Sequence, residues 1–183
     1  MEWIVLGLVA VLLIWGIWIY NRLIKLRNRV ATAWSDIDVQ LTRRHELVPN
    51  LVEIVSAYTD HERETLAQVT RLRTEAVDTQ SPARLGAIEN ELEQLISRLM
   101  LLKEDYPDLK ASDNYAQLTD KLVEVEDHLV YARRYYNGAV RDLNIAISQF
   151  PDLLVARPLK FTEAEFYSAE DSHRSVPGTG GLA

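Results

Sequence analysis

Residues 3–20 read WIVLGLVAVLLIWGIWIY, eighteen residues without a charged side chain. Eleven of them are Leu, Ile or Val, which together favour insertion into a bilayer by roughly 3 to 7 kcal/mol. As an α-helix the stretch is about 27 Å long, close to the thickness of the hydrocarbon core of a bilayer. It therefore predicts one transmembrane helix, and we place a membrane signal-anchor at residues 1–22.

A cleaved secretory signal is the alternative interpretation of this stretch. Such a signal has basic residues ahead of a short apolar run and small residues at A-x-A spacing after it. Here Met1 and Glu2 include no Lys or Arg, and the apolar run has no such ending. The sequence has no cysteine either, which excludes a lipid-modified thiol. We therefore expect the helix to be retained as the anchor.

Basic residues lie on one side of the apolar run only: Arg22, Lys25, Arg27 and Arg29. Because Lys and Arg beside a membrane span tend to stay in the cytoplasm, we expect the body of the protein inside the cell and Met1 outside. Aromatic rings, which prefer the headgroup level, lie near both ends of the run: Trp3, Trp15, Trp18 and Tyr20. These eight residues are the predicted membrane-anchor and topology residues.

Charge is distributed unevenly along the chain. The first 29 residues have a net charge of +3, so the remaining 154 residues carry −10 of the total of −7. An acidic body repels phosphate backbones, which argues against a nucleic acid partner. The lack of cysteine also excludes disulfides, thiolate metal sites and cysteine nucleophiles. The membrane bilayer is the partner that the composition favours.

The body, residues 23–167, shows apolar residues at helical spacing between breakers. We predict helices at about 23–77, 82–104 and 114–150. The clearest apolar seam, with Ser81 as its N-cap and Pro82 in its first turn, consists of Leu85, Ile88, Leu92, Leu95, Leu99 and Leu102. Narrow seams on long helices joined by short connections predict an all-α, elongated antiparallel bundle of three to four long helices. Residues 168–183 have the composition of a disordered tail.

The first predicted helix contains Pro49, which removes one backbone hydrogen bond and clashes with the preceding turn. Apolar spacing continues in phase on both sides, so we expect a kink there, with a full break into two helices as the alternative. Arg44 and Glu62 lie on or beside the apolar stripe of this helix. We expect both side chains to reach water past the seam.

The search for chemistry finds no catalytic, cofactor-binding or metal-binding residues. Glu124 and His128 are four residues apart, which differs from the Glu-x-x-His spacing of metal sites in helical bundles, and we expect an exposed pair. No glycine-rich phosphate-binding motif is present, and no small-molecule substrate is indicated.

Arg133, Arg134 and Tyr135 place cationic and aromatic groups on adjacent faces of the third predicted helix, which makes them a candidate contact for an acidic partner. The alternative is structural: the arginines pair with carboxylates such as Asp36 or Asp38, while Tyr136 fills the seam.

Three stretches of the sequence resemble one family. They are YNRLIKLRNRVATAWSDIDVQLTRRHELVPNLVEIVSAYTDHE at 20–62, YARRYYNGAVRDLNIAISQFP at 131–151 and KFTEAEFY at 160–167. Together they resemble the bacterial LemA family over nearly the whole chain up to Tyr167. The resemblance implies a single-pass protein of the bacterial inner membrane with a long helical bundle on the cytoplasmic side. The family has no securely assigned reaction.

The leading functional hypothesis is a non-enzymatic, membrane-tethered helical module that acts as a scaffold through protein contacts. The partners would be its own copies or other envelope proteins. Two alternatives remain: a carboxylate–metal enzyme built on a helical bundle, and a lipid-binding protein that shapes membranes.

Overall fold

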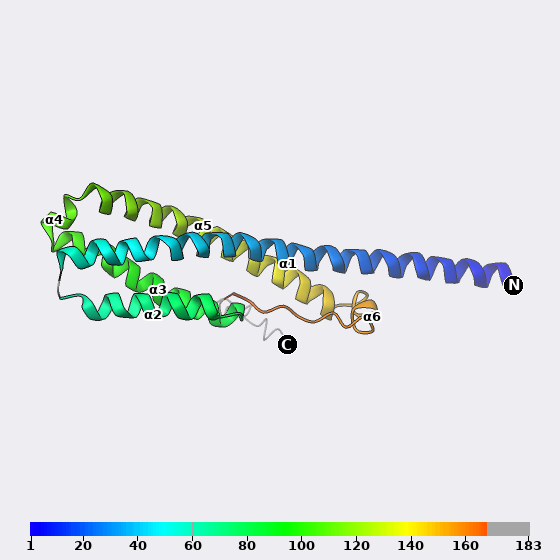
Figure 1. The fold of residues 1–183 in the computed structure, drawn as a ribbon. Helices are drawn as coiled ribbons and strands as arrows, with labels where there is room; N and C mark the ends of the chain where they lie inside the picture. Colours follow the sequence, from blue (N-terminus) through cyan, green and yellow to red (C-terminus); the bar gives the residue numbers. More distant parts are fainter. Residues whose placement is uncertain (60, 168–183) are drawn as a thin grey trace, which may run out of the picture. The chain divides into compact units, whose positions relative to one another are not determined.

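The computed structural model describes residues 1–59 and 61–167. Within these ranges the chain is all-α and contains no strand, which confirms the predicted fold class. The elements follow one another as shown in Figure 1: α1 (Glu2–Tyr58), α2 (Arg63–Asp78), α3 (Pro82–Leu101), η1 (Leu102–Glu104), α4 (Pro107–Lys110), α5 (Asp113–Ser148) and α6 (Leu153–Ala156). The predicted tail, 168–183, lies outside the described residues.

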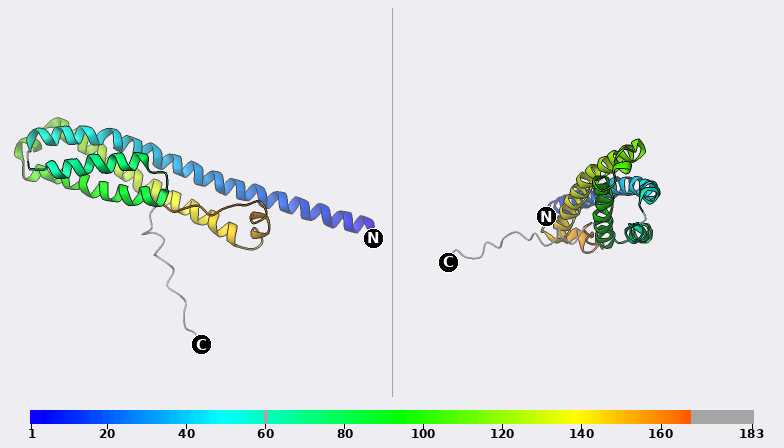
Figure 2. Two further views of the ribbon diagram at one scale, coloured as in Figure 1. Left: turned by 60° about the horizontal axis from the view of Figure 1, so that its bottom comes forward. Right: turned by 90° about the vertical axis from the view of Figure 1, so that its left-hand side faces the viewer.

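The chain forms two compact units. The anchor unit consists of residues 1–35 and 134–164, and the bundle unit consists of residues 36–133 together with the segment that begins at Glu165. Helices α1 and α5 contribute residues to both units. In the bundle unit, α2 and α3 lie side by side in both views of Figure 2.

Helix α3 forms where the sequence predicted it. The Ser81 side chain accepts a hydrogen bond from the Arg84 N–H at 3.4 Å, and Pro82 occupies the first turn, as expected for a capped N-terminus. The buried face differs from the predicted seam at one step, because Ile96 is buried whereas Leu95 is half-buried. The buried positions Leu85, Glu89, Leu92, Ile96 and Leu99 alternate by four and three, so a glutamate occupies a core position.

The prediction of one helix over 23–77 is wrong, because α1 ends at Tyr58 and α2 begins at Arg63. The buried hydroxyl of Thr59 accepts a hydrogen bond from the His61 N–H at 3.2 Å and donates one to the Tyr106 hydroxyl at 3.0 Å. The N-cap of α2 is Glu62, whose side chain makes no capping hydrogen bond, so no local capping signal marks this break.

Helix α1 continues through Pro49, so the alternative of two helices divided there is also wrong. A bend at Pro49 stays a prediction. The other two predicted helices agree with the structure within a few residues, as 82–104 corresponds to α3 with η1 and 114–150 to α5.

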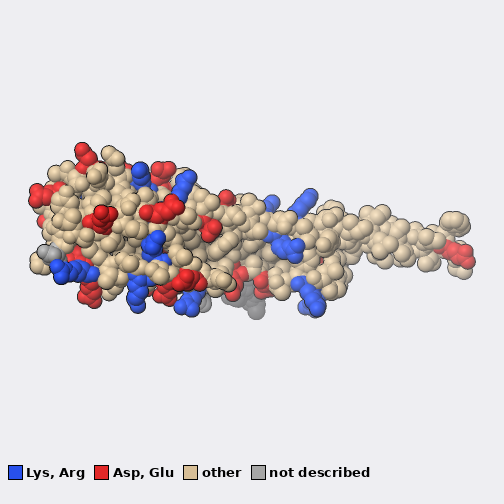
Figure 3. Space-filling model, in the orientation of Figure 1, with Lys and Arg blue, Asp and Glu red and all other residues tan. Residues whose placement is uncertain are grey.

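The N-terminal part of α1 has the length and composition of a membrane-crossing helix. Its most apolar eighteen residues have a mean hydropathy of 2.4, and only 6% of them are buried. On the face seen in Figure 3, this stretch has no Lys, Arg, Asp or Glu side chain between its tip and the basic side chains that follow. The N-terminal helix is therefore a candidate membrane anchor.

Candidate functional site: a buried charge cluster in the bundle unit

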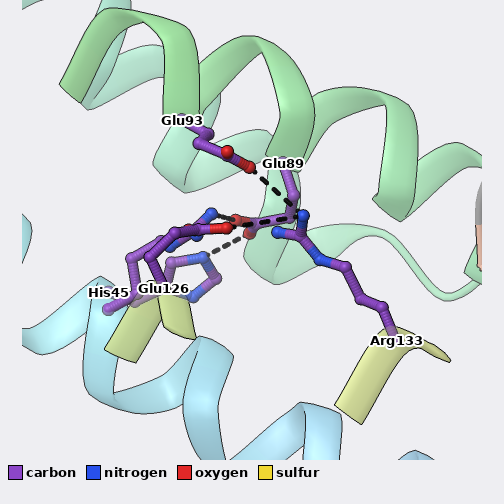
Figure 4. Close-up of polar contacts among 6 residues, drawn as sticks. His45, Glu89, Glu93, Glu126 and Arg133 are labelled. Atoms are coloured by element: carbon purple, nitrogen blue, oxygen red, sulfur yellow. Dashed lines mark hydrogen bonds and ion pairs between the residues drawn. The ribbon is translucent and has the colours of Figure 1, made fainter. Parts of the chain in front are cut away.

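A cluster of charged side chains lies inside the bundle unit, among the apolar seams that the sequence predicted. We call it the charge cluster, and Figure 4 shows it; its members are Arg44 and His45 from α1, Glu89 and Glu93 from α3, and Glu126 and Arg133 from α5. Three helices that are distant in sequence therefore meet through charged groups.

Arg44 lies at the centre of the cluster. Its Nη1 donates to Glu89 Oε2 at 3.0 Å, and its Nη2 forms an ion pair with Glu126. The whole residue is only 2% exposed, and Glu89 is fully buried. The expectation that Arg44 reaches water past the seam is therefore wrong. The physical reason is the glutamate at a core position of α3, which compensates the buried guanidinium.

The remaining members bind around this pair. His45 Nε2 and Glu89 Oε1 are 2.6 Å apart, so Glu89 is held by two side chains of α1. Arg133 Nη1 donates to Glu93 Oε2 at 3.2 Å and lies 3.7 Å from Glu126 Oε1. Two guanidinium groups thus face three carboxylates in the cluster. A buried network of this kind stabilises one arrangement of the helices only when all its members are present.

Burial alters the acid–base properties of the groups in and beside the cluster. It lowers the pKa of the Arg44 guanidinium, an effect that the Glu89 carboxylate opposes. Burial also raises the pKa of the Tyr167 hydroxyl to about 12, although the neighbouring Arg133 guanidinium favours the ionised form. Arg133 lies over the Tyr167 ring at 5.4 Å from its centroid, a cation–π contact.

Because Pro49 has no N–H, one backbone carbonyl of α1 is available to another helix. In a regular helix the residue at position 49 would donate to the carbonyl of His45, and Pro49 cannot do so. Arg73 Nε from α2 donates to the His45 carbonyl instead, at 2.7 Å. The R-R-H-E-L-V-P stretch therefore holds α3 through the side chains of Arg44 and His45, and α2 through a backbone carbonyl.

The segment after α6 returns to α3 at Gly86. A Cβ atom at this position would overlap the backbone carbonyl of Tyr167, so glycine permits the close approach. Tyr167 is 1% exposed, and Ser81 Oγ donates to Glu165 Oε2 at 2.8 Å on the same helix end. The end of the described chain is thus fastened to α3 beside the charge cluster.

A groove between α3 and α5 opens beside the cluster. A pocket of about 140 Å³ includes Arg44, Glu93 and Glu126 in its lining, and a second of about 340 Å³ shares Ser97, Met100 and Val123 with it. We call the two together the α3–α5 groove. Its exposed apolar side chains are Leu101 and Val123, so it offers an apolar contact surface above a charged floor.

The predicted membrane-anchor residues all lie in the anchor unit. Trp3 and Trp18 are exposed, whereas Trp15 is partly buried against the core of the unit. Tyr20 packs edge-on against Phe161, with ring centroids 6.2 Å apart. Their membrane roles stay predictions.

The four basic residues of the topology signal are exposed, and three of them also contact other side chains of the unit. Arg22 forms an ion pair with Asp152, and Arg29 lies 3.7 Å from Asp142. Arg27 lies over the Phe161 ring, 5.7 Å from its centroid. Lys25 is exposed.

The candidate partner-contact residues separate by burial. Arg133 belongs to the charge cluster and pairs with Glu93 and Glu126, so the expected pairing with Asp36 or Asp38 is wrong for this residue. Arg134 and Tyr135 are exposed and stay candidates. Tyr136 fills the seam as predicted, since it is 3% exposed and its ring centroid lies 5.3 Å from that of Trp34.

The side chains weighed for metal binding do not converge. Glu124 and His128 form an exposed pair at 3.7 Å, as predicted. Across residues 1–59 and 61–167, no three His, Asp or Glu side chains are placed to hold one metal ion.

Comparison with known proteins identifies relatives over most of the chain. A model of the LemA family matches residues 33–179. Protein LemA of Metamycoplasma hominis is 28% identical over 158 residues, which cover 84% of this chain and 71% of that protein. Magnetosome protein MamQ 2 of Paramagnetospirillum magneticum is 26% identical over 177 residues, covering 81% of this chain. Magnetosome protein MamQ of Magnetospirillum gryphiswaldense is 24% identical over 174 residues. The match spans 64% of the length of each of these two magnetosome proteins.

Proposed function

The chain belongs to the LemA family, and we propose that it is a membrane-anchored helical-bundle protein that acts as a non-enzymatic scaffold through contacts with other proteins, its own copies included. We place it in the bacterial inner membrane as a single-pass protein, with its N-terminus outside and the bundle unit in the cytoplasm. Support for the anchor comes from the exposed apolar stretch of α1. Support for the orientation comes from the basic residues that follow it.

The observation that carries the contact role is the α3–α5 groove. Exposed apolar side chains, Leu101 at 65% and Val123 at 49%, border it, and Arg44 and Glu126 line its floor. An apolar surface next to fixed charges suits a protein partner, because apolar contact supplies affinity and the charges select among partners. A common membrane tether raises the local concentration of such partners, so weak contacts suffice.

Crosslinking in native membranes tests this role. The chain has no cysteine, so Val123→Cys introduces a single thiol at the groove. We expect a reagent with a maleimide at one end, which alkylates this thiol, and a benzophenone at the other, which inserts into a nearby C–H bond on illumination, to convert this variant into a covalent dimer or into an adduct with one other envelope protein. Val77→Cys is the matched control, because Val77 is 62% exposed on α2 and lies outside the groove.

The control defines what would contradict the proposal. Crosslinking of Val77→Cys as strong as that of Val123→Cys would indicate random collision within the membrane. A Val123→Cys protein that stays monomeric, without any adduct, would overturn the contact role of the groove.

A further inference from the structure

Residues 149–161, which include α6, form an apolar projection of the anchor unit that we call the juxtamembrane lobe. Its exposed apolar side chains are Phe150 at 77%, Leu154 at 55% and Leu159 at 53%. Three large apolar side chains within ten residues, all outside the core, are unusual for a segment that meets only water. We therefore expect an apolar environment, such as a lipid leaflet, to cover these side chains of the lobe.

The lobe packs against the part of α1 where the apolar run ends. Its residue Ala156 belongs to one core cluster with Ile19 and Leu23 of α1, and Trp15 and Phe161 pack against that cluster. In α1, Trp15 precedes Tyr20 by five residues, which is about 7.5 Å along a helix. The lobe thus accompanies α1 into the predicted membrane span rather than stopping at its end.

Bilayer thickness explains why this position matters. Residues 2–14 of α1 are exposed along their whole length, and as a helix they span about 20 Å. The hydrocarbon core of a bilayer is about 30 Å thick, so the residues that follow must supply the remainder of the crossing. Those residues include Ile19, which shares its core cluster with Ala156 of the lobe and with the end of α5, and Trp15, which packs against that cluster. A membrane that covers α1 fully therefore also meets the lobe.

The charges of the anchor unit suit such contact. Asp152, the only acidic residue of the lobe, is buried and forms an ion pair with Arg22, which removes an isolated negative charge from the apolar surface. The exposed charges of the lobe, Arg157 and Lys160, are both basic. Residues 1–35 and 134–164 contain eight basic and four acidic residues, so the unit has a net charge of +4 and the rest of the chain carries −11. A basic surface next to an apolar one is typical of segments that bind anionic membrane leaflets.

We propose that the juxtamembrane lobe is a second membrane contact, in which Phe150, Leu154 and Leu159 enter the leaflet beside α1 while Arg157 and Lys160 bind anionic lipid headgroups. This inference rests on the proposed membrane anchor. It adds that α1 and the lobe enter the leaflet as one packed body, so that the lobe holds the end of the transmembrane helix in a set orientation.

Fluorescence quenching in vesicles tests the proposal, and the lack of native cysteine makes single-site labelling clean. The full chain is reconstituted into vesicles of phosphatidylcholine and phosphatidylglycerol, with an environment-sensitive dye on one introduced thiol. Leu154→Cys reports on the lobe, and Val9→Cys reports on the anchor. Leu101→Cys is the matched control, because Leu101 is 65% exposed in the bundle unit.

We expect nitroxide-labelled lipids to quench the dye at positions 154 and 9 and to leave the dye at position 101 bright. Quenching at position 9 but not at 154 would overturn the lobe proposal and leave the anchor intact. A bright dye at position 9 would instead overturn the anchor and, with it, the lobe. Equal quenching at 101 and 154 would contradict the assignment to the lobe. A further outcome would also overturn the proposal. If the dye at position 154 shows blue-shifted emission that nitroxide-labelled lipids do not quench, and if that shift disappears when the protein is diluted with lipid, the neighbour of the lobe is a second copy of the chain.

Discussion

The charge cluster leads to a sharp prediction about stability. Replacing Arg44 with methionine leaves the Glu89 carboxylate, which is fully buried, with His45 as its remaining partner. Removing one member of a buried ion pair costs about 3 to 5 kcal/mol, because the other charge stays in a poorly solvating environment. For a chain of this size, each kcal/mol lowers the midpoint of thermal unfolding by about 2 to 4 °C. We therefore expect Arg44→Met to lower it by about 6 to 20 °C.

Thermal unfolding of the full chain in lipid nanodiscs, followed by circular dichroism, measures this loss. Arg43→Met is the matched control, because Arg43 precedes Arg44 on α1 and is exposed. We expect the control to cost less than about 0.5 kcal/mol, as is usual for an exposed side chain without special contacts.

A double variant separates the penalty of an unpaired charge from other effects. In Arg44→Met with Glu89→Leu, no carboxylate remains buried at position 89, so at least half of the stability lost in Arg44→Met should return. The reasoning is refuted if Arg44→Met costs no more than Arg43→Met. It is also refuted if the double variant loses the sum of the two single losses, since uncoupled residues behave in that way.

Three further predictions concern the contacts around the cluster. Gly86→Ala should lower the free energy of unfolding by about 1 to 3 kcal/mol, because its Cβ would displace a backbone carbonyl. Gly138→Ala, with open space at the Cβ, should raise it by about 0.5 to 1 kcal/mol, and equal unfolding curves for the two variants would contradict this. Tyr167, whose folded pKa is about 12, should contribute stability that is complete below pH 10 and is lost as the pH rises from about 10 to 12, a total of about 2 to 3 kcal/mol. In a circular dichroism titration, Tyr167→Phe should remove this contribution and leave that of Tyr115, whose pKa burial also raises. Arg73→Met should lower the stability of the native chain but have little effect in a Pro49→Ala background, because the N–H of residue 49 can then donate to the His45 carbonyl that Arg73 binds. Equal losses of stability in both backgrounds, measured by unfolding, would show that the two residues are independent.

The helices could be predicted because their signals are local. The Ser81-Pro82 start of α3 and the apolar spacing of α5 depend on residues within one or two helical turns of each other. The break after Tyr58 has no such signal, because α2 begins after Glu62, whose side chain makes no capping hydrogen bond. Apolar spacing continued across it, so periodicity alone joined two helices into one.

The charge cluster had no comparable local signal. Arg44 and Glu89 are 45 residues apart, and each is, by type, a residue that usually faces water. The sequence offered two weak clues: Arg44 lies on or beside the apolar stripe of the first helix, and Glu89 falls at helical spacing between Leu85 and Leu92. A glutamate in that register is buried only if another helix brings a cation to it, which a single helix cannot reveal.

The amino-acid sequence by itself therefore determined the all-α class, the apolar stretch of the N-terminal helix and most helix boundaries, because each follows from hydrophobicity and capping over a short range. Three features depend on the folded chain: the burial of particular charges, the bond from Arg73 to the carbonyl that lacks its helical donor at Pro49, and the shared core of segment 149–161 with Ile19 and Leu23 of α1. The physical reason is that the free energy of a buried charge or an exposed apolar side chain depends on its neighbours in space, and those neighbours come from distant parts of the chain.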